Sequence, residues 1–216
     1  MRMSELTPAL YSGPQDSIAS SRFRCEHRVM LSLLLAVSVS VSQMVEPDFD
    51  DLRELVNFHS PQPELVWTVV NDNVMGGRSS GDFAISDGRL VFRGEINTNG
   101  GGFSSIRTEP EQLDIGRHDG LKLKVCGDGR TYKFRIVTEG SDFAYMADFP
   151  TRHGQWEIID LPFSTFQPSW RGRKLDRPPV KPSDINSIGF MIADKRDGEF
   201  ALEVEWIRLS RSKSRY

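Results

Sequence analysis

The sequence has little that would support a disulfide framework or a metal centre. It contains two cysteines and four histidines in 216 residues, and neither residue type shows the spacing of a metal-binding motif. Cys25 falls in the expected leader, so Cys126 is interpreted as a small buried apolar residue. We therefore expect a fold held by its hydrophobic core, with no metal and no cofactor. A structural calcium ion held by loop oxygens is the alternative.

Neither sign of charge dominates the chain. Lys and Arg total 27 against 30 Asp and Glu, which gives a formal charge of −3. General nucleic-acid binders are usually clearly basic, so we expect no nucleic-acid partner. Apolar residues make up 38% of the chain, which together with 18 glycines is ordinary for a globular protein. This composition excludes a disordered chain and a coiled coil.

Long hydrophobic runs are also lacking, apart from one at residues 29–42. This run is too short for a membrane-spanning helix, which needs roughly 17–25 residues. Arginines precede it and Ser40-Val41-Ser42 ends it, as is typical of a secretory signal peptide. We expect an exported protein, periplasmic or extracellular, with no stable membrane span in the mature chain. A mitochondrial leader, or a true start at Met3 or Met30, is the alternative.

A short helix is predicted after the leader. Phe49, Leu52, Leu55 and Val56 recur at helical spacing, and aspartates gather at the amino end of this segment. The prolines of Ser60-Pro61-Gln62-Pro63 end the helix and begin a linker. The predicted division is a leader at 1–42, a short helix and linker at 43–63, a β-sandwich domain at 64–210 and a basic tail at 211–216.

Beyond the linker, the hydrophobic period is two. Leu121–Val125 and Tyr132–Ile136 alternate apolar with basic residues on either side of a Gly-Asp-Gly turn, which predicts a β-hairpin. Asp87-Gly88 and Asp197-Gly198 predict two more hairpin turns. The fold class is therefore all-β, an antiparallel β-sandwich or jelly roll. Strands are predicted at 66–70, 82–86, 89–94, 103–108, 121–125, 132–136, 143–149, 155–161, 188–193 and 200–209.

The segment 167–183 interrupts this pattern with four prolines and no periodicity. Structureless loops of this length tend to be functional or disordered. Its run Trp170-Arg171-Gly172-Arg173 places an aromatic ring beside two guanidinium groups, which suits stacking on a sugar or anchoring at a protein interface. The alternative is that Trp170 packs the loop onto the sandwich.

The densest polar loop is Asn71–Arg78. Its glycines would let backbone N–H groups converge on an anion, and Arg78 would add a donor. The alternative is that asparagine and glycine only satisfy a tight turn. Gly77–Gly81 matches the G-x-S-x-G nucleophile elbow, but an elbow needs a helix after it, so we interpret it as a plain loop. With no matched acid, base and nucleophile, we predict that the protein is not an enzyme.

Several sequence blocks in one order resemble the complex I intermediate-associated protein 30 family over about residues 64–209. The blocks are Trp67–Ser79, Gly101–Arg107, Asp119–Leu121, Val125–Tyr132, Trp156 with Pro162-Phe163, Arg171–Arg173, Ile188–Lys195 and Gly198–Val204. The resemblance implies a galactose-binding-like β-sandwich. It also implies a chaperone-like assembly factor that holds intermediates of the NADH:ubiquinone oxidoreductase membrane arm without catalysing its reaction.

The expected function is therefore a non-catalytic binding or assembly protein that engages a protein partner through rim loops. By resemblance the partner is a respiratory-complex subunit, although an export-type leader suggests a bacterial-type member whose partner is unknown. One alternative is a carbohydrate-binding module, and a second is an enzyme acting on a glycan or nucleotide cofactor. Candidate binding residues are Asn71, Asp72, Arg78, Arg107, Asp128, Arg130, Trp170, Arg171, Arg173, Asp194 and Lys195.

Overall fold

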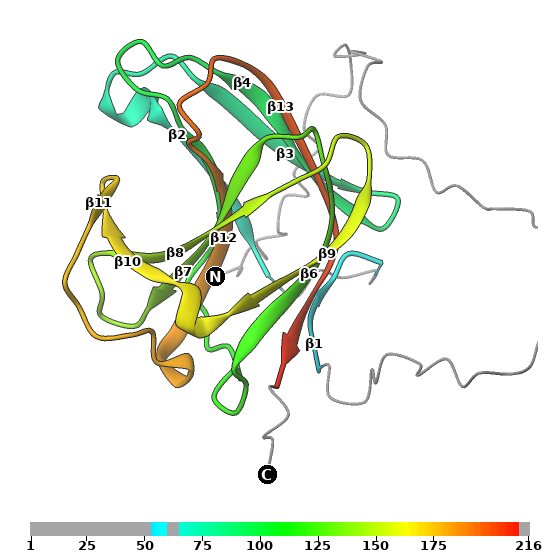
Figure 1. Cartoon of the computed structure of the whole chain (residues 1–216), viewed down its shortest axis with the longest axis vertical. Coiled ribbons are helices and arrows are strands. Elements are labelled where there is room, and N and C mark those ends of the chain that lie inside the picture. Colours follow the sequence, from blue (N-terminus) through cyan, green and yellow to red (C-terminus); the bar gives the residue numbers. More distant parts are fainter. Residues whose placement is uncertain (1–52, 60–64, 212–216) are drawn as a thin grey trace, which may run out of the picture.

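The computed structural model describes residues 53–59 and 65–211, which form two antiparallel β-sheets around one core (Figure 1). The six-stranded sheet has the order β3-β4-β13-β6-β9, and β1 also pairs with β13. The seven-stranded sheet has the order β11-β10-β8-β7-β12-β5-β2. This confirms the predicted antiparallel β-sandwich.

The strands and three short 3-10 helices have the following bounds, in chain order. They are β1 (Arg53–Asn57), β2 (Trp67–Asn71), η1 (Asp72–Met75), β3 (Ser80–Ser86), β4 (Arg89–Ile96), β5 (Ser104–Thr108), β6 (Gly120–Gly127), β7 (Thr131–Thr138), β8 (Ala144–Pro150), β9 (Trp156–Pro162), η2 (Phe163–Thr165), β10 (Gln167–Trp170), β11 (Arg173–Lys174), η3 (Pro182–Asp184), β12 (Ile185–Ile192) and β13 (Gly198–Ser210).

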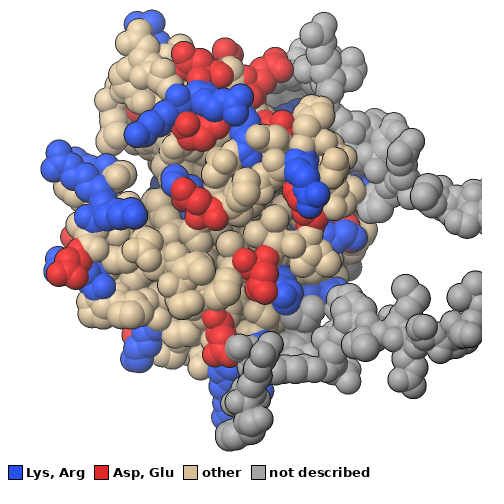
Figure 2. All heavy atoms as spheres, viewed as in Figure 1, with Lys and Arg blue, Asp and Glu red and all other residues tan. Residues whose placement is uncertain are grey.

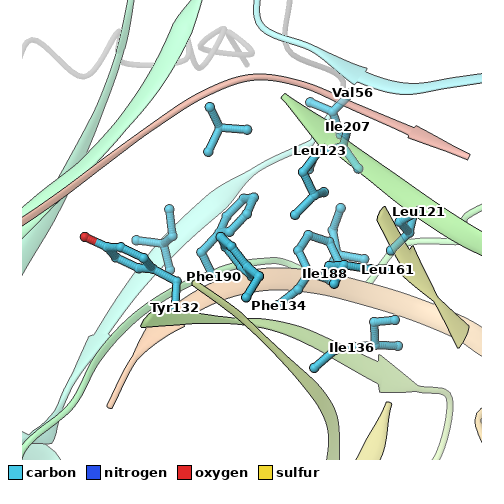
Figure 3. Packing of buried hydrophobic residues seen from close by; sticks show 14 of the residues in the cluster. Val56, Leu121, Leu123, Tyr132, Phe134, Ile136, Leu161, Ile188, Phe190 and Ile207 are labelled. Carbon is cyan, nitrogen blue, oxygen red and sulfur yellow. The ribbon is translucent and has the colours of Figure 1, made fainter. Parts of the chain in front are cut away.

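The core lies between the two sheets because each strand turns its apolar side chains inward. Leu121 and Leu123 of β6 and Phe134 and Ile136 of β7 are fully buried. Figure 3 shows these side chains meeting between the layers, together with Phe190 of β12. The rings of Phe134 and Phe190 pack edge to face with centroids 5.2 Å apart, a favourable aromatic geometry. Cys126 is fully buried on β6, but it is disulfide-bonded, so its interpretation as a plain apolar residue is wrong.

The predicted hairpin between residues 121 and 136 is wrong, although both of its strands exist. β6 pairs with β13 and β9 in one sheet, whereas β7 pairs with β12 and β8 in the other. The segment 128–130 therefore carries the chain across the sandwich, and the two apolar faces oppose one another instead of lying side by side. The Asp197-Gly198 hairpin is wrong for the same reason, because β12 and β13 belong to different sheets.

The Asp87-Gly88 turn is confirmed as a two-residue hairpin between β3 and β4. Ser86 pairs with Arg89, and Asp87 and Gly88 have φ values of 53° and 71°. Two consecutive positive φ values are those of a type I′ turn, whose twist matches that of the flanking strands. The Asp-Gly dipeptide is a frequent sequence for this turn.

The short helix predicted before residue 60 is wrong over the described residues. Arg53–Asn57 is strand β1, which pairs antiparallel with Arg53 opposite Leu209 and Asn57 opposite Trp206. Its position beside β13 extends the sandwich to the amino side of the predicted boundary at 64. The leader at 1–42, the residues from 43 to 52 and the tail at 212–216 lie outside the described residues.

The segment 167–183 is not a structureless loop throughout. β10 and β11 form a hairpin at the edge of the seven-stranded sheet, with Trp170 opposite Arg173. The turn residues Arg171 and Gly172 have φ values of 48° and 75°, again a type I′ geometry.

Within residues 53–59 and 65–211, the structure contains no helix with the length and hydrophobicity of a membrane span.

Candidate functional site

Asp72 is the centre of a first polar cluster, which joins two of the loops singled out in the sequence. Its carboxylate is fully buried at the start of η1. Ser79 donates to it twice, from its backbone N–H at 2.8 Å and from its hydroxyl at 2.6 Å. Gly102 N–H donates at 2.6 Å and Phe103 N–H at 3.3 Å. Backbone N–H groups therefore converge on an anion, but the anion is the protein's own Asp72.

Two glycines allow these loops to close around the carboxylate. A Cβ at either Gly77 or Gly101 would overlap the carboxylate atoms of Asp72. Ser79 is buried, its hydroxyl donates to Asp72, and it also accepts from Asn97 N–H at 3.1 Å. This supports the interpretation of Gly77–Gly81 as a plain loop, because the Ser79 hydroxyl serves as an internal link.

The pKa of Asp72 reflects two opposing effects. Burial by itself raises the pKa of a carboxyl group, since it disfavours the charged form. The hydrogen bonds from the Ser79 hydroxyl and from the Gly102, Ser79 and Phe103 amides outweigh burial, and the pKa lies below 3.8. Asp72 is therefore ionised at neutral pH and serves as a structural anion.

Asp128, Arg130 and Asp194 form a second polar cluster at the crossings between the sheets. Arg130 forms a bidentate ion pair with Asp194, in which Nε donates to Oδ2 at 2.9 Å and Nη2 donates to Oδ1 at 2.6 Å. Its Nη1 donates to the carbonyls of Gly198 and Glu199, both at 2.9 Å, and Nη2 donates to the carbonyl of Arg196. One guanidinium thus fixes the whole connection between β12 and β13.

Asp128 completes this cluster. Its Oδ1 accepts from Arg130 N–H at 3.0 Å and from the Tyr132 hydroxyl at 3.1 Å, and its Oδ2 accepts from Ala201 N–H at 2.9 Å. Burial and the Asp128 charge raise the pKa of Tyr132. Burial raises and the Arg130 contact lowers the pKa of Asp194, and the net shift is downward. The hydrogen bond from Asp194 raises the pKa of Arg130, so both members of the pair stay charged.

The candidate residues divide into an internal group and an exposed group. Asp72, Asp128, Arg130 and Asp194 are held in the two clusters, and Asn71 links Gly81 O and Ser104 Oγ at 3.0 and 2.6 Å. Exposed side chains are Arg78, Trp170, Arg171, Arg173 and Lys195. Lys195 follows Asp194 in the β12–β13 connection.

The two exposed loops that we expected to form one surface lie at opposite edges of the seven-stranded sheet. η1 and the Arg78 loop follow the edge strand β2, whereas Trp170 and Arg173 lie on the β10–β11 hairpin at the other edge. In Figure 1 both edges project to the left of the view. Figure 2 shows the basic side chains of the hairpin at this side, with a hollow between them and the loops above.

Arg107 stands apart from both groups. It lies half-buried on β5, where its Nη2 donates to Ser105 Oγ at 3.4 Å. Its buried Nε has no hydrogen-bond partner in the part of the chain that the structure describes. Sequence reasoning missed Arg135 on β7, which neighbours Arg107 across β12. The only sequence signal for it was the basic alternation of the strand, which is also typical of an ordinary solvated face. No group of three potential metal-ligating side chains occurs within residues 53–59 and 65–211.

Comparison with known proteins identifies relatives over most of the chain. Residues 56–204 match the family model described as Complex I intermediate-associated protein 30. A protein of that name, designated mitochondrial, from Drosophila melanogaster is 31% identical over 180 residues, which is 71% of this chain and 61% of the relative. The protein of the same name from Mus musculus is 27% identical over 208 residues, 77% of this chain and 61% of the relative. This chain therefore spans about three-fifths of the length of these two relatives.

Solved structures with a similar fold include carbohydrate-binding modules. A family 11 module of a Clostridium thermocellum cellulosomal cellulase superposes with a TM-score of 0.54 at 16% identity, covering 74% of this chain and 95% of the module. A structure of a family 11 module from the same organism with a mixed-linked tetrasaccharide gives 0.53 at 17% identity, over 75% and 96%. At these identities the likeness shows the fold alone, which is a β-sandwich as expected.

Proposed function

The chain belongs to the complex I intermediate-associated protein 30 family, and we propose that it is a non-catalytic binding protein that associates with a complex I intermediate through its rim loops. The observation that carries this proposal is the division of the candidate residues. The buried polar residues fasten the loops to the sandwich, while apolar and cationic side chains are exposed on the loops so held.

The β10–β11 hairpin is the first contact surface. Trp170 is 43% exposed, and the Arg171 guanidinium carbon lies 4.6 Å from the centroid of its ring. Tryptophan and arginine are the residues most enriched among interface side chains that dominate binding energy. The two-residue turn pre-organises both side chains, which reduces the conformational entropy lost on binding.

The tip of η1 is the second contact surface. Val74 and Met75 are 69% and 54% exposed, and Arg78 follows them in the same loop. Apolar side chains of this size on an exposed turn favour a protein contact over plain solvation. Because Asp72 and Gly77 anchor the two ends of this turn, the tip is held in a fixed position.

We propose the mitochondrion as the compartment. Two relatives carry the designation mitochondrial in their names, which favours the mitochondrial alternative of the sequence analysis, and nothing in the comparisons supports export. The leader at 1–42 is then a transit segment. Fractionation of cells expressing the full chain tests this, and recovery of the protein outside mitochondria would contradict it.

The partner is tested by affinity purification of the tagged full chain from mitochondria, with quantitative identification of complex I subunits. We expect enrichment of these subunits with the wild type and with the control Arg93→Ala, an exposed arginine of β4 in the other sheet. The variant Arg171→Ala/Arg173→Ala should lose most of the enrichment. Absence of complex I subunits with the wild type would refute the partner, and equal recovery with the double variant would refute the surface.

A carbohydrate ligand is the second candidate, favoured by the exposed ring of Trp170 at the sheet edge. Aromatic rings stack on sugar faces, but Arg171 already occupies one face of this ring. Calorimetric titration with soluble mixed-linked glucan separates the candidates. Binding that is lost in Trp170→Ala would favour the carbohydrate, whereas absence of binding would remove it.

A further inference from the structure

Two arginines from strands distant in sequence lie in one row on the outer face of the seven-stranded sheet. Arg107 of β5 and Arg135 of β7 are both in register with Gly189 of β12, which lies between them. With strands spaced about 4.8 Å apart, their Cα atoms are roughly 10 Å apart, within the combined reach of two arginine side chains. The core-facing neighbours Ile106, Phe134 and Phe190 are fully buried on the opposite face.

These guanidinium groups have few internal partners. Among the described residues, Arg107 makes one long hydrogen bond, to Ser105 Oγ at 3.4 Å, and its buried Nε has no partner there. Arg135 has no hydrogen bond or ion pair with any residue that the structure describes. Buried or half-buried polar groups normally find a partner, and the guanidinium of Arg130 shows how this chain does so elsewhere.

The two cations also disfavour one another. Burial lowers the pKa of Arg107, and burial together with the charge of Arg107 lowers the pKa of Arg135 to about 10. The neighbouring Lys133 is paired with Asp148 at 2.5 Å, so its charge is already balanced. The arginine row thus carries uncompensated positive charge, an arrangement that costs stability unless another group compensates it.

Gly189 leaves the space between the arginines free of a side chain. A Cβ at this position would overlap the carbonyl oxygen of Ile106 and crowd the backbone of Arg107. Only backbone atoms of β12 therefore lie between the two arginine side chains, both of which carry several N–H donors. The sheet edges at η1 and at the β10–β11 hairpin project beyond this face on the same side (Figure 1).

We propose that Arg107 and Arg135 bind an oxyanion, a carboxylate or a phosphate, above Gly189 on the outer face of the seven-stranded sheet. Arginine suits this ligand because its planar fork donates two parallel hydrogen bonds to two oxygens of one group. A second guanidinium on the other side of the ligand would donate to the remaining oxygens. This site is separate from the rim-loop surfaces and does not depend on the identity of the protein partner.

The test is calorimetric titration of the full chain with inorganic phosphate and, separately, with succinate, at constant ionic strength set with sodium chloride. We expect saturable binding of at least one probe. Binding should weaken at least about tenfold in Arg135→Met, since loss of charge-assisted hydrogen bonds is worth that much. Arg107→Met should do the same, and the exposed Arg93→Met is the control that should bind as the wild type does.

Thermal unfolding without the probes guards against a variant that fails to fold. Arg135→Met should melt no lower than the wild type, because it removes an unpaired cation and keeps most of the side-chain volume. Binding of phosphate alone assigns a phosphate group, and binding of succinate alone assigns a carboxylate. Absence of saturable binding by the wild type, or binding by both arginine variants as tight as that of the wild type, would overturn the proposal.

Discussion

Replacement of Asp72 by alanine tests whether one buried carboxylate holds two loops together. The substitution removes the acceptor of four hydrogen bonds, three from N–H groups and one from the Ser79 hydroxyl. A buried donor left unpaired costs about 1–3 kcal/mol. Because water can reach some of these half-buried donors, we take the lower end of that range for each of them. The free energy of unfolding should then fall by about 4 kcal/mol. This is a large part of the 5–15 kcal/mol that ordinarily separates folded from unfolded protein.

The measurement is equilibrium unfolding in urea, with Asp142→Ala as the matched control. Asp142 is exposed in the β7–β8 connection, and its replacement should change the free energy of unfolding by less than about 0.5 kcal/mol. Asp72→Asn should lose less than Asp72→Ala, since one oxygen acceptor remains. A loss below about 1 kcal/mol in Asp72→Ala would contradict this expectation, because several buried donors left unpaired should together cost more than that.

The Asp72 carboxylate should also make the free energy of unfolding depend on pH. The pKa of Asp72 in the folded state lies below its ordinary value of 3.8, which applies to the unfolded chain. The carboxylate therefore contributes stability above pH 3.8, and this contribution is lost as the pH falls through the folded-state pKa. The difference in free energy of unfolding between wild type and Asp72→Ala should be constant near neutral pH and shrink below pH 3.8. A difference that grew under acid would contradict this sign.

Three further changes have distinct expected outcomes. Asp194→Ala leaves Arg130 charged and buried, so the free energy of unfolding should fall by about 3–5 kcal/mol in urea titrations. Gly189→Ala forces a methyl group against the backbone of β5, which should cost about 1–3 kcal/mol or more in the same assay. Trp170→Ala removes a side chain that is 43% exposed at a sheet edge, and its melting temperature should stay close to that of the wild type while partner recovery falls.

The local hydrophobic pattern was sufficient to predict most strands but not how they pair. Alternation at Leu121–Val125 and Tyr132–Ile136 correctly indicates two half-buried strands. The turn between them has the composition of a hairpin turn, yet Arg130 turns inward to reach Asp194, a contact between residues 64 positions apart. A contact between residues so far apart leaves no local sequence pattern, so the sequence does not predict the crossing between the sheets.

The error at Arg53–Asn57 has a similar cause. Leu55 and Val56 fall at helical spacing with Leu52 and Phe49, and a helix satisfies this spacing without long-range partners. Pairing with Trp206–Leu209 at the far end of β13 decides the outcome instead, because a strand beside a long edge gains a ladder of backbone hydrogen bonds. Tertiary pairing therefore overrides the local preference.

The candidate site was predictable only in part, and the reason is that charge in a sequence does not reveal burial. Asp72 and Arg130 lie in loops whose composition is typical of ligand-binding sites. In the structure both side chains instead bind groups of the protein itself. Arg135 lies in a strand whose alternation is typical of an ordinary solvated face. In the structure it is half-buried beside a second cation. An internal ion pair and an open cationic site differ only in whether an acid approaches from a distant strand.

This difference explains why the two kinds of arginine should respond oppositely to mutation. Arg130 donates hydrogen bonds to Asp194 and to three carbonyl groups. Its removal should therefore leave the buried Asp194 carboxylate without its cation and destabilise the fold. Arg135 pairs with no acid of residues 53–59 and 65–211, so its removal relieves repulsion with Arg107. A residue that the fold would be more stable without is better explained by a ligand than by packing, and the arginine row above Gly189 therefore points to binding on the sheet face.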